Sequence, residues 1–72
     1  SFLPRAVVIG FGPIGQAAVH EISKIGYHVT VVDQNVDAIA SLKGRKVEAI
    51  FGDAAQFHIL EKAQLENARL LV

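Results

Sequence analysis

The chain has 72 residues, 51% of them hydrophobic, and its seven basic and seven acidic residues balance to a formal net charge of zero. This balance excludes the basic surface by which proteins bind nucleic acids, and the absence of cysteine excludes disulfides, thiol catalysis and cysteine metal sites. No apolar run approaches the ~20 residues that are needed to cross a bilayer.

The small size and the apolar composition predict one domain that belongs to a longer protein. A chain of 72 residues buries little surface by itself, yet the mean hydropathy is +0.38. The chain begins without methionine and ends in the apolar run Leu70-Leu71-Val72. We therefore expect residues 1–72 to form a single domain of a longer chain, with a core that can continue into a partner subunit.

The first strand is expected at 5–9, after a lead-in at 1–4. Its residues are apolar without alternation, as in a parallel-sheet strand that is covered on both faces. It is followed by Gly10-Phe11-Gly12-Pro13-Ile14-Gly15, in which three glycines have the spacing G-x-G-x-x-G. Alone this motif is a weak signal, but here it follows a strand, opens a helix, and precedes the acidic Asp33 by 18 residues. This context is typical of a dinucleotide-binding loop.

The three glycines have separate roles in such a loop. Gly10 permits the tight turn out of the strand, Gly12 lets a phosphate approach the backbone, and Gly15 lets the following helix pack closely on the sheet. The helix starts at the loop, with Pro13 at a first position that suits a residue without an N–H, and Gly26 ends it. Helical spacing predicts its buried face: Ile14, Ala18, Ile22 and Ile25.

A second strand is expected at 28–32, where β-branched residues are frequent, and it ends at Asp33. Asn35 is a suitable N-cap for the helix that follows, and Gly44 ends that helix. The apolar positions of this second helix are Val36, Ile39, Ala40 and Leu42.

The third strand is expected at 47–51, and the loop Gly52-Asp53-Ala54 connects it to a third helix at about 55–63. A turn then leads to a fourth strand, from residue 69 to the end. The third helix is expected to bury Phe57, Leu60 and Ala63.

The regular alternation of strands and helices predicts an α/β fold. Short connections and right-handed crossovers give a Rossmann-like, doubly wound parallel sheet with strand order 3-2-1-4 and helices on both faces. This is the N-terminal half of such a fold together with the strand beyond its switch point. A nucleotide would bind at the carboxyl ends of the strands, between strands one and four. The three loops that we expect to be functional, residues 10–15, 33–35 and 52–54, all lie at this edge.

The glycine loop and the start of the first helix are predicted to bind a phosphate or pyrophosphate. Backbone N–H groups and the positive end of the helix dipole point at an anion there. Pro13 has no N–H to donate, so we expect the N–H groups of Gly12 and Ile14 to contribute more. The alternative is that a proline at the start of a helix has no consequence for binding.

Asp33 is placed where a carboxylate accepts hydrogen bonds from the hydroxyls of an adenosine ribose. The same charge repels a 2′-phosphate, and Gln34 follows rather than an arginine that would attract one. NAD(H), AMP or another adenine nucleotide is therefore favoured over NADP(H). The alternative is that Asp33 is a solvated cap before the second helix.

Asp53 has two interpretations of equal weight. It can cap the third helix, or Gly52-Asp53-Ala54 can lie beside the adenosine and contact the base or the ribose. The three histidines, His20, His28 and His58, share neither a loop nor helical spacing, so they predict no metal site and no catalytic base. No serine–histidine pair or carboxylate pair for catalysis is evident, and catalytic residues are not expected.

Four stretches together resemble the TrkA-N, or RCK (regulator of potassium conductance), domain. They are the residues 7–16 around the glycine loop, Val29-Thr30-Val31-Val32-Asp33, Gly52-Asp53-Ala54 and Ala68-Arg69-Leu70-Leu71-Val72. The resemblance covers nearly the whole chain, and its most specific part is the Gly-Asp-Ala loop with the Ala-Arg-Leu-Leu-Val strand. The Phe-Gly-Pro form of the loop resembles the antiporter (Kef-type) members.

The resemblance implies a regulatory role. Domains of this family lie on the cytoplasmic side of potassium channels, uptake systems and potassium/proton antiporters, where they bind NAD(H), ATP, ADP or AMP and transmit the ligand state to the membrane pore. They act as homodimers or larger rings. The phosphate loop would be residues 10–15, the ribose-binding acid Asp33, and the residues along the adenosine Asp53 and Ala54. Many relatives have an arginine where Pro13 stands, and the chain lacks the last strands and helix of the family domain, which commonly form the dimer contact.

Three functions are consistent with the sequence. The first is a non-catalytic nucleotide-binding module that regulates a potassium transport protein. The second is the cofactor-binding half of an NAD-dependent oxidoreductase, whose substrate groups would lie in a further half of the fold. The third is an interaction module whose nucleotide site no longer binds. The Gly-Asp-Ala loop favours the first.

Overall fold

The computed structural model describes residues 3–72; residues 1 and 2 of the expected lead-in lie outside the described residues. Four parallel strands form one sheet in the order β3-β2-β1-β4. The strands are β1 (Arg5–Ile9), β2 (His28–Asp33), β3 (Glu48–Phe51) and β4 (Ala68–Leu71). The helices are α1 (Pro13–Lys24), α2 (Val36–Ser41), α3 (Phe57–Lys62) and the short 3-10 helix η1 (Leu65–Asn67). The α/β fold and strand order predicted from the sequence are confirmed.

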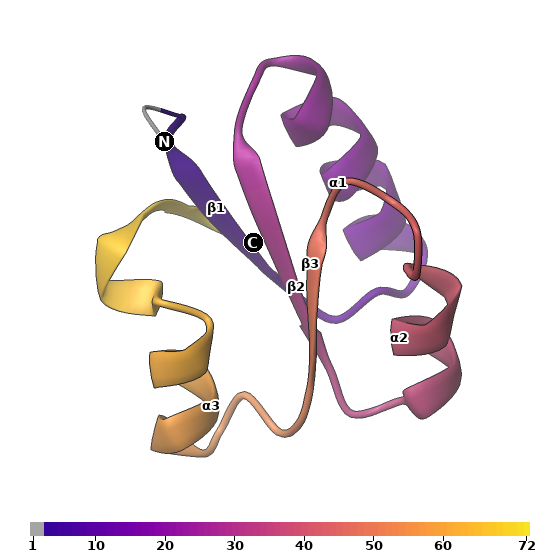
Figure 1. The fold of residues 1–72 in the computed structure, drawn as a ribbon, viewed down its shortest axis with the longest axis vertical. Helices are drawn as coiled ribbons and strands as arrows, with labels where there is room; N and C mark the ends of the chain where they lie inside the picture. The colour runs from indigo at the N-terminus through magenta and orange to yellow at the C-terminus, as the bar shows by residue number, and fades with distance from the viewer. Residues whose placement is uncertain (1–2) are drawn as a thin grey trace.

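The helices cover both faces of the sheet. Figure 1 shows α1 and α2 together on one side and α3 on the other. The core is divided accordingly. Val8 and Val31 pack with Leu42 in the cluster on the α1–α2 side, whereas Val7 and Val32 pack with residues of α3 and β3 in the other cluster. Neighbouring residues of the central strands therefore face different layers, which explains why β1 and β2 are apolar without alternation.

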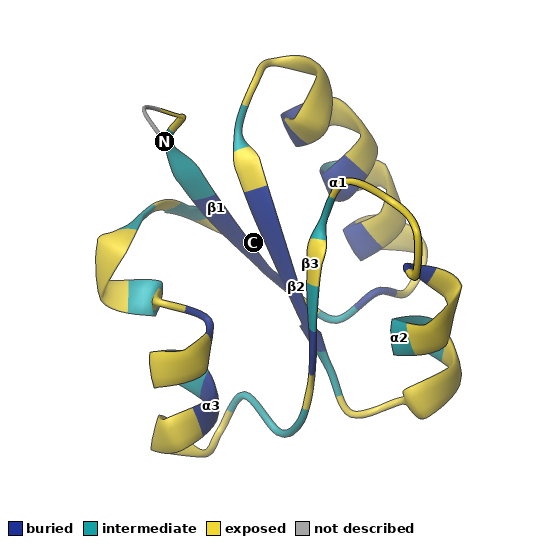
Figure 2. Cartoon of the chain, in the orientation of Figure 1, coloured by how far each residue is buried: buried dark blue, intermediate teal, exposed yellow. Residues whose placement is uncertain are grey.

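The middle residues of the central strands β1 and β2 are buried, and the outer surfaces of the helices are exposed (Figure 2). One buried residue of β2 is polar: Thr30, which is fully buried. Its hydroxyl accepts a hydrogen bond from Arg5 Nη1 at 2.9 Å and donates one to Glu48 Oε1 at 2.9 Å. This chain of contacts joins β1, β2 and β3 near their amino ends, opposite the edge where the predicted functional loops lie.

The buried face of α1 differs from the prediction. Ile22 is buried, but Ile14 and Ile25 are 81% and 70% exposed, and the buried residues of α1 are Gly15, Val19 and Ile22. The reason is that Gly15 lies directly against the loop, where a Cβ would overlap the carbonyl oxygen of Gly10. Residues four and seven positions after Gly15 then face the sheet, and Ile14 points away from it.

The third helix is shorter than predicted and uses a different face. It begins at Phe57 rather than near residue 55, and the ring of Phe57 is exposed. Ile59 and Ala63 are buried, while Leu60 is half-buried. In the second helix region Leu42 is buried just beyond the end of α2, and Val36 is exposed. None of the helices between residues 3 and 72 has the length and hydrophobicity to span a membrane.

The predicted end of the first helix and the predicted start of the second are confirmed, whereas α2 ends at Ser41, three residues before the predicted Gly44. The Asn35 side chain accepts hydrogen bonds from the N–H groups of Asp37 and Ala38, at 2.8 and 3.2 Å, and so caps α2. Gly26, just after α1, has a φ of +92°, the left-handed conformation that ends a helix at little cost when the residue is glycine. Both signals are local, which is why the sequence alone predicts them.

Candidate functional site

Two adjoining hollows lie at the carboxyl edge of the sheet. The first, which we call the acidic hollow, has a volume of about 210 Å³ and is lined by Gly10, Asp33, Gln34, Gly52, Asp53 and Ala54, together with Ile9 and Val32. The second, the loop hollow, has a volume of about 390 Å³ and is lined by Gly10, Gly12, Pro13, Ile14 and Gly15, together with Ile9 and Val72. Every predicted site residue except Phe11 lines one of the two hollows.

Two glycines of the loop are required by the backbone conformation and the packing of the protein, whether or not a ligand is bound. Gly10 has a φ of +92°, which a residue with a side chain rarely adopts. Gly15 lies so close to the Gly10 carbonyl that it leaves no room for a Cβ. Gly12 is different, since its φ is −79° and a Cβ there would meet no atom within 4 Å. If glycine is needed at this position, the reason is a bound group and not the packing of the protein.

Asp33 connects two of the three loops. Its Oδ2 accepts a hydrogen bond from the backbone N–H of Phe11 at 2.7 Å, and its Oδ1 accepts one from the N–H of Asn35 at 2.7 Å. Each carboxylate oxygen can accept a second hydrogen bond, so the side chain still has capacity for a ligand hydroxyl. Asp33 therefore holds the glycine loop against the end of β2, a structural role that the sequence motif does not predict.

Asp53 caps a turn and not the helix that was expected to begin there. Its Oδ1 accepts from the N–H of Ala55 at 2.8 Å, and its carbonyl accepts from the N–H of Gln56 at 3.0 Å. Gln56 is the N-cap residue of α3, without a side-chain hydrogen bond. The preceding Gly52 is closely packed, because a Cβ there would overlap the side chain of Ile59. These contacts hold the third loop at the rim of the acidic hollow.

Phe11 is buried beneath the loop and lines neither hollow. Its ring belongs to the core cluster on the α1–α2 side, and the Arg45 guanidinium carbon lies 5.7 Å from the ring centroid, within the range of a cation–π contact. Its carbonyl accepts a hydrogen bond from Gln16 Nε2 at 3.2 Å. Neither the role of Gln16 nor the contact of Arg45 can be predicted from the sequence, because neither follows from a spacing rule.

The two hollows differ in the groups that they offer. The acidic hollow has two carboxylates, and the loop hollow has backbone groups and apolar side chains; no lysine, arginine or histidine of the described chain lines either one. Within residues 3–72 no three His, Cys, Asp or Glu side chains are grouped so that they could hold a metal ion. The arrangement can accept hydrogen bonds from hydroxyls at one end and donate N–H groups to an anion at the other.

The sequence model of the TrkA-N domain matches residues 6–72, almost the whole chain. The chain belongs to the TrkA-N domain family. An uncharacterised protein of Methanocaldococcus jannaschii is 40% identical over 65 residues, which are 90% of this chain and 13% of that protein. The glutathione-regulated potassium-efflux system protein KefC of Klebsiella pneumoniae is 32% identical over 69 residues, 96% of this chain and 11% of KefC. This TrkA-N domain thus spans only a small part of the curated relatives.

Solved structures agree with the family and its Kef type. The TrkA-N domain of the inner membrane protein YbaL from Escherichia coli is 25% identical, with a TM-score of 0.88 over 99% of this chain and 53% of that one. The AMP-bound C-terminal domain of Kef from Shewanella denitrificans is 28% identical, with a TM-score of 0.76 over 93% of this chain and 39% of that one. An L-alanine dehydrogenase is also 28% identical, with a TM-score of 0.77 over 94% of this chain and 19% of the enzyme. The same half-fold therefore occurs in both transport proteins and enzymes.

Proposed function

We propose that this TrkA-N domain is a regulatory module that binds NAD(H) or an adenine nucleotide and belongs to a potassium channel, uptake system or potassium/proton antiporter. The observation that carries the proposal is the convergence of Asp33, the glycine loop and the Gly52-Asp53-Ala54 loop on two adjoining hollows. The AMP-bound Kef domain, which is similar over most of this chain, supports the same ligand class.

The proposed ligand lies along the carboxyl edge of the sheet. Its ribose hydroxyls donate to Asp33, and its adenosine lies beside Gln34, Gly52, Asp53 and Ala54. Its phosphate accepts from the N–H group of Gly12, which precedes α1, and from those of Ile14 and Gly15 in its first turn, where N–H groups have no partner inside the helix. A 2′-phosphate placed beside the carboxylates of the acidic hollow is repelled, so NADP(H) is disfavoured.

The charges at the site favour a ligand with little phosphate charge. The loop hollow offers backbone N–H groups and the helix dipole, but no cationic side chain of the described chain lines it. These groups suit one phosphate or a pyrophosphate diester. A triphosphate brings additional negative charge close to the two carboxylates without a compensating cation. Among the candidates, AMP and NAD(H) are therefore expected to bind more tightly than ADP and ATP.

Regulation requires that the ligand distinguish between two arrangements of the assembly. A nucleotide that binds one arrangement more tightly shifts the equilibrium toward it, and only this difference can act on a pore. The proposed partners are the membrane transport domain of the parent protein and further copies of this domain, as a homodimer or a larger ring. Residues 1–72 would form a single nucleotide-binding domain on the cytoplasmic side of the cell membrane.

The main alternative is the cofactor-binding half of an NAD-dependent oxidoreductase. The similarity to an L-alanine dehydrogenase is the observation that favours it. Against it, the hollows contain no histidine, serine or lysine of the described residues that could act on a substrate. A non-catalytic role is therefore proposed.

Isothermal titration calorimetry with NAD⁺, NADH, NADP⁺, AMP, ADP and ATP tests the proposal. We expect AMP or NAD(H) to bind, NADP⁺ not to bind, and Asp33→Asn to weaken binding. Asp37→Asn is the matched control, because Asp37 is exposed and lines neither hollow. AMP that binds as tightly as NAD⁺ would favour the sensor over the enzyme, since the nicotinamide half would then contribute nothing. No binding by any of the six nucleotides to the folded protein would favour the interaction module.

A further inference from the structure

Gln16 holds the centre of the glycine loop from two directions. Its backbone N–H donates to the Gly12 carbonyl at 2.8 Å, which closes the first turn of α1. Its side-chain Nε2 donates to the Phe11 carbonyl at 3.2 Å. Gln16 itself is exposed and lines neither hollow, so its side chain is not expected to touch a ligand. What it contacts is the peptide bond between Phe11 and Gly12.

This peptide bond places two polar groups in the loop, the Phe11 carbonyl and the Gly12 N–H. The Phe11 carbonyl and the Gly12 N–H belong to one planar trans unit, in which they point in opposite directions. When Gln16 holds the carbonyl toward α1, the N–H is directed away from Gln16, and Gly12 is one of the residues that line the loop hollow. If the unit rotated by half a turn, a carbonyl oxygen would replace the N–H at the hollow and would repel an anion.

Glycine makes such a rotation easy, and the other contacts of Phe11 do not prevent it. Gly12 has no side chain that restricts its backbone, and the space around it is open. Asp33 holds the preceding peptide unit through the Phe11 N–H, and the buried ring is covered by Arg45. Of the contacts described for Phe11, only the Gln16 hydrogen bond acts on the carbonyl that shares a plane with the Gly12 N–H.

We propose that Gln16 is a positioning residue that keeps the Gly12 N–H directed at the phosphate of the ligand. The inference rests on the proposed function, because it assigns the means by which the same site recognises a phosphate. Gln16 acts on the phosphate end alone, since Asp33 and the Gly52-Asp53-Ala54 loop are held by other contacts. The proposal therefore predicts that Gln16 affects phosphorylated ligands and leaves adenosine unaffected.

The test compares AMP and adenosine in calorimetric titrations of the wild-type protein, Gln16→Met and Gln16→Glu. Methionine has a similar length but no donor, and glutamate presents an acceptor to the Phe11 carbonyl. We expect Gln16→Met to weaken AMP binding about three- to tenfold, the typical effect of one hydrogen bond. Gln16→Glu should weaken AMP binding more. Adenosine affinity is expected to be the same in all three. Gln56→Met, at an exposed position outside both hollows, is the control and should bind AMP like the wild type.

A second measurement does not depend on a ligand. The ¹⁵N shift of the Gly12 amide and the carbonyl ¹³C shift of Phe11 report the orientation of their shared peptide unit, and both should change in Gln16→Met while other loops keep their shifts. Unchanged AMP affinity together with unchanged shifts would overturn the inference and leave the proposed function intact. Equal loss of AMP and adenosine would also overturn it, because the side chain would then support the fold in general. A folded wild-type protein that binds none of the six nucleotides would remove the proposed function and this inference with it.

Discussion

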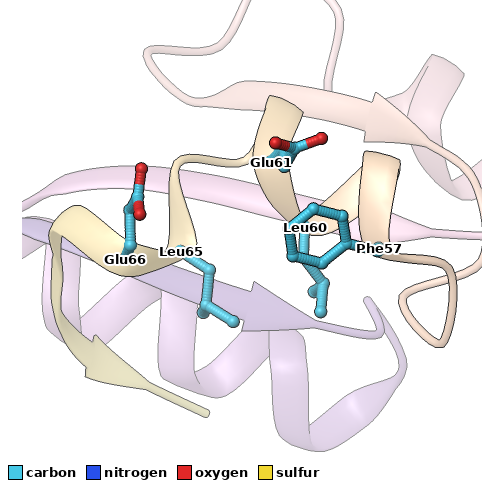
Figure 3. A pocket seen from close by; sticks show the side chains of 5 residues that line it. All are labelled: Phe57, Leu60, Glu61, Leu65 and Glu66. Atoms are coloured by element: carbon cyan, nitrogen blue, oxygen red, sulfur yellow. The ribbon is translucent and has the colours of Figure 1, made fainter.

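Two regions of the molecule, the carboxyl edge of the sheet and the surface of α3 and η1, contain hollows of nearly equal volume but of different chemistry. The acidic hollow has a volume of about 210 Å³, and a hollow of about 200 Å³ is lined by residues of α3 and η1. The second, which we call the α3–η1 hollow, is lined by Phe57, Leu60, Glu61, Leu65 and Glu66. Figure 3 shows its apolar side chains, with the carboxylates of Glu61 and Glu66 directed away from them.

The difference lies in which groups converge. The acidic hollow gathers loops that follow three different strands, and these loops are held by hydrogen bonds from backbone N–H groups to the carboxylates of Asp33 and Asp53. The α3–η1 hollow gathers side chains of one helix and the turn after it, and its apolar residues offer no donor to a phosphate. Volume alone therefore does not distinguish the proposed nucleotide site; the donors and acceptors that parallel strands bring together at their carboxyl ends are the reason for proposing it.

We expect the largest effect on stability from a side chain added at Gly15, where α1 packs against the glycine loop. In Gly15→Ala the new Cβ overlaps the Gly10 carbonyl, and backbone cannot move aside as a flexible side chain can. We expect a loss of about 3 kcal/mol in the free energy of unfolding, the upper range for overpacking. Urea denaturation measures it. If Gly15→Ala were as stable as the wild type, α1 would not be held against the loop in the way described.

The next largest effect on stability is expected for Asp33, which joins two loops, in comparison with the exposed Asp37. In Asp33→Asn one of the two backbone N–H groups faces an amide NH₂ instead of a carboxylate oxygen. We expect a loss of about 2 kcal/mol in unfolding free energy, typical for a charge-assisted hydrogen bond, and weaker nucleotide binding. Asp37→Asn should lose only a few tenths of that amount, because its charge interacts mainly with the helix dipole. Similar losses in the two variants by urea denaturation would contradict the role of Asp33 in the loop.

Gly12→Ala tests whether glycine serves the ligand and not the fold. The backbone conformation suits alanine and the space for a Cβ is empty, so unfolding free energy should stay within about 0.5 kcal/mol of the wild type. The methyl group would nevertheless lie where a phosphate approaches, and AMP affinity should fall about tenfold or more, as expected when one close polar contact is displaced. Calorimetry and urea denaturation on the same sample give both values. Unchanged AMP affinity would show that the phosphate does not lie beside Gly12.

The smallest effect is expected at the α3–η1 hollow. The Phe57 ring is 74% exposed, so Phe57→Ser should change unfolding free energy by no more than about 0.5 kcal/mol. Nucleotide affinity should not change, because Phe57 lines neither hollow at the carboxyl edge. A loss of AMP binding in this variant would show that the two regions are coupled and would break the contrast between them.

The prediction from sequence succeeded where a local pattern carries its own physical reason. Gly10 and Gly26 have the positive φ values that the loop and the helix end require, and Asn35 caps α2 through its side chain. The alternation of strands and helices was enough for the sheet order, since crossovers in parallel sheets are right-handed. The placement of Asp33 at the edge beside the glycine loop follows from that order.

The errors occurred where a residue's environment depends on a distant neighbour. Ile14 was expected in the core and is exposed, and Phe57 was expected to be buried and is exposed as well. Each helical residue is turned about 100° from the one before it, so a small difference in how a helix lies on the sheet exchanges the buried and exposed positions. For α1 that placement depends on the contact between Gly15 and Gly10, and for α3 on the contact between Gly52 and Ile59.

By itself, the sequence determined the α/β class, the strand order, the glycine loop and the edge at which a nucleotide would lie, because spacing along the chain and the conformational needs of glycine and proline act locally. Only the tertiary structure decided that Asp33 bonds the Phe11 N–H, that Gln16 holds the Phe11 carbonyl, and that Arg45 covers the ring. These contacts join parts of the chain that no periodic pattern relates. They form because the packed sheet brings side chains and backbone groups within hydrogen-bonding distance of one another.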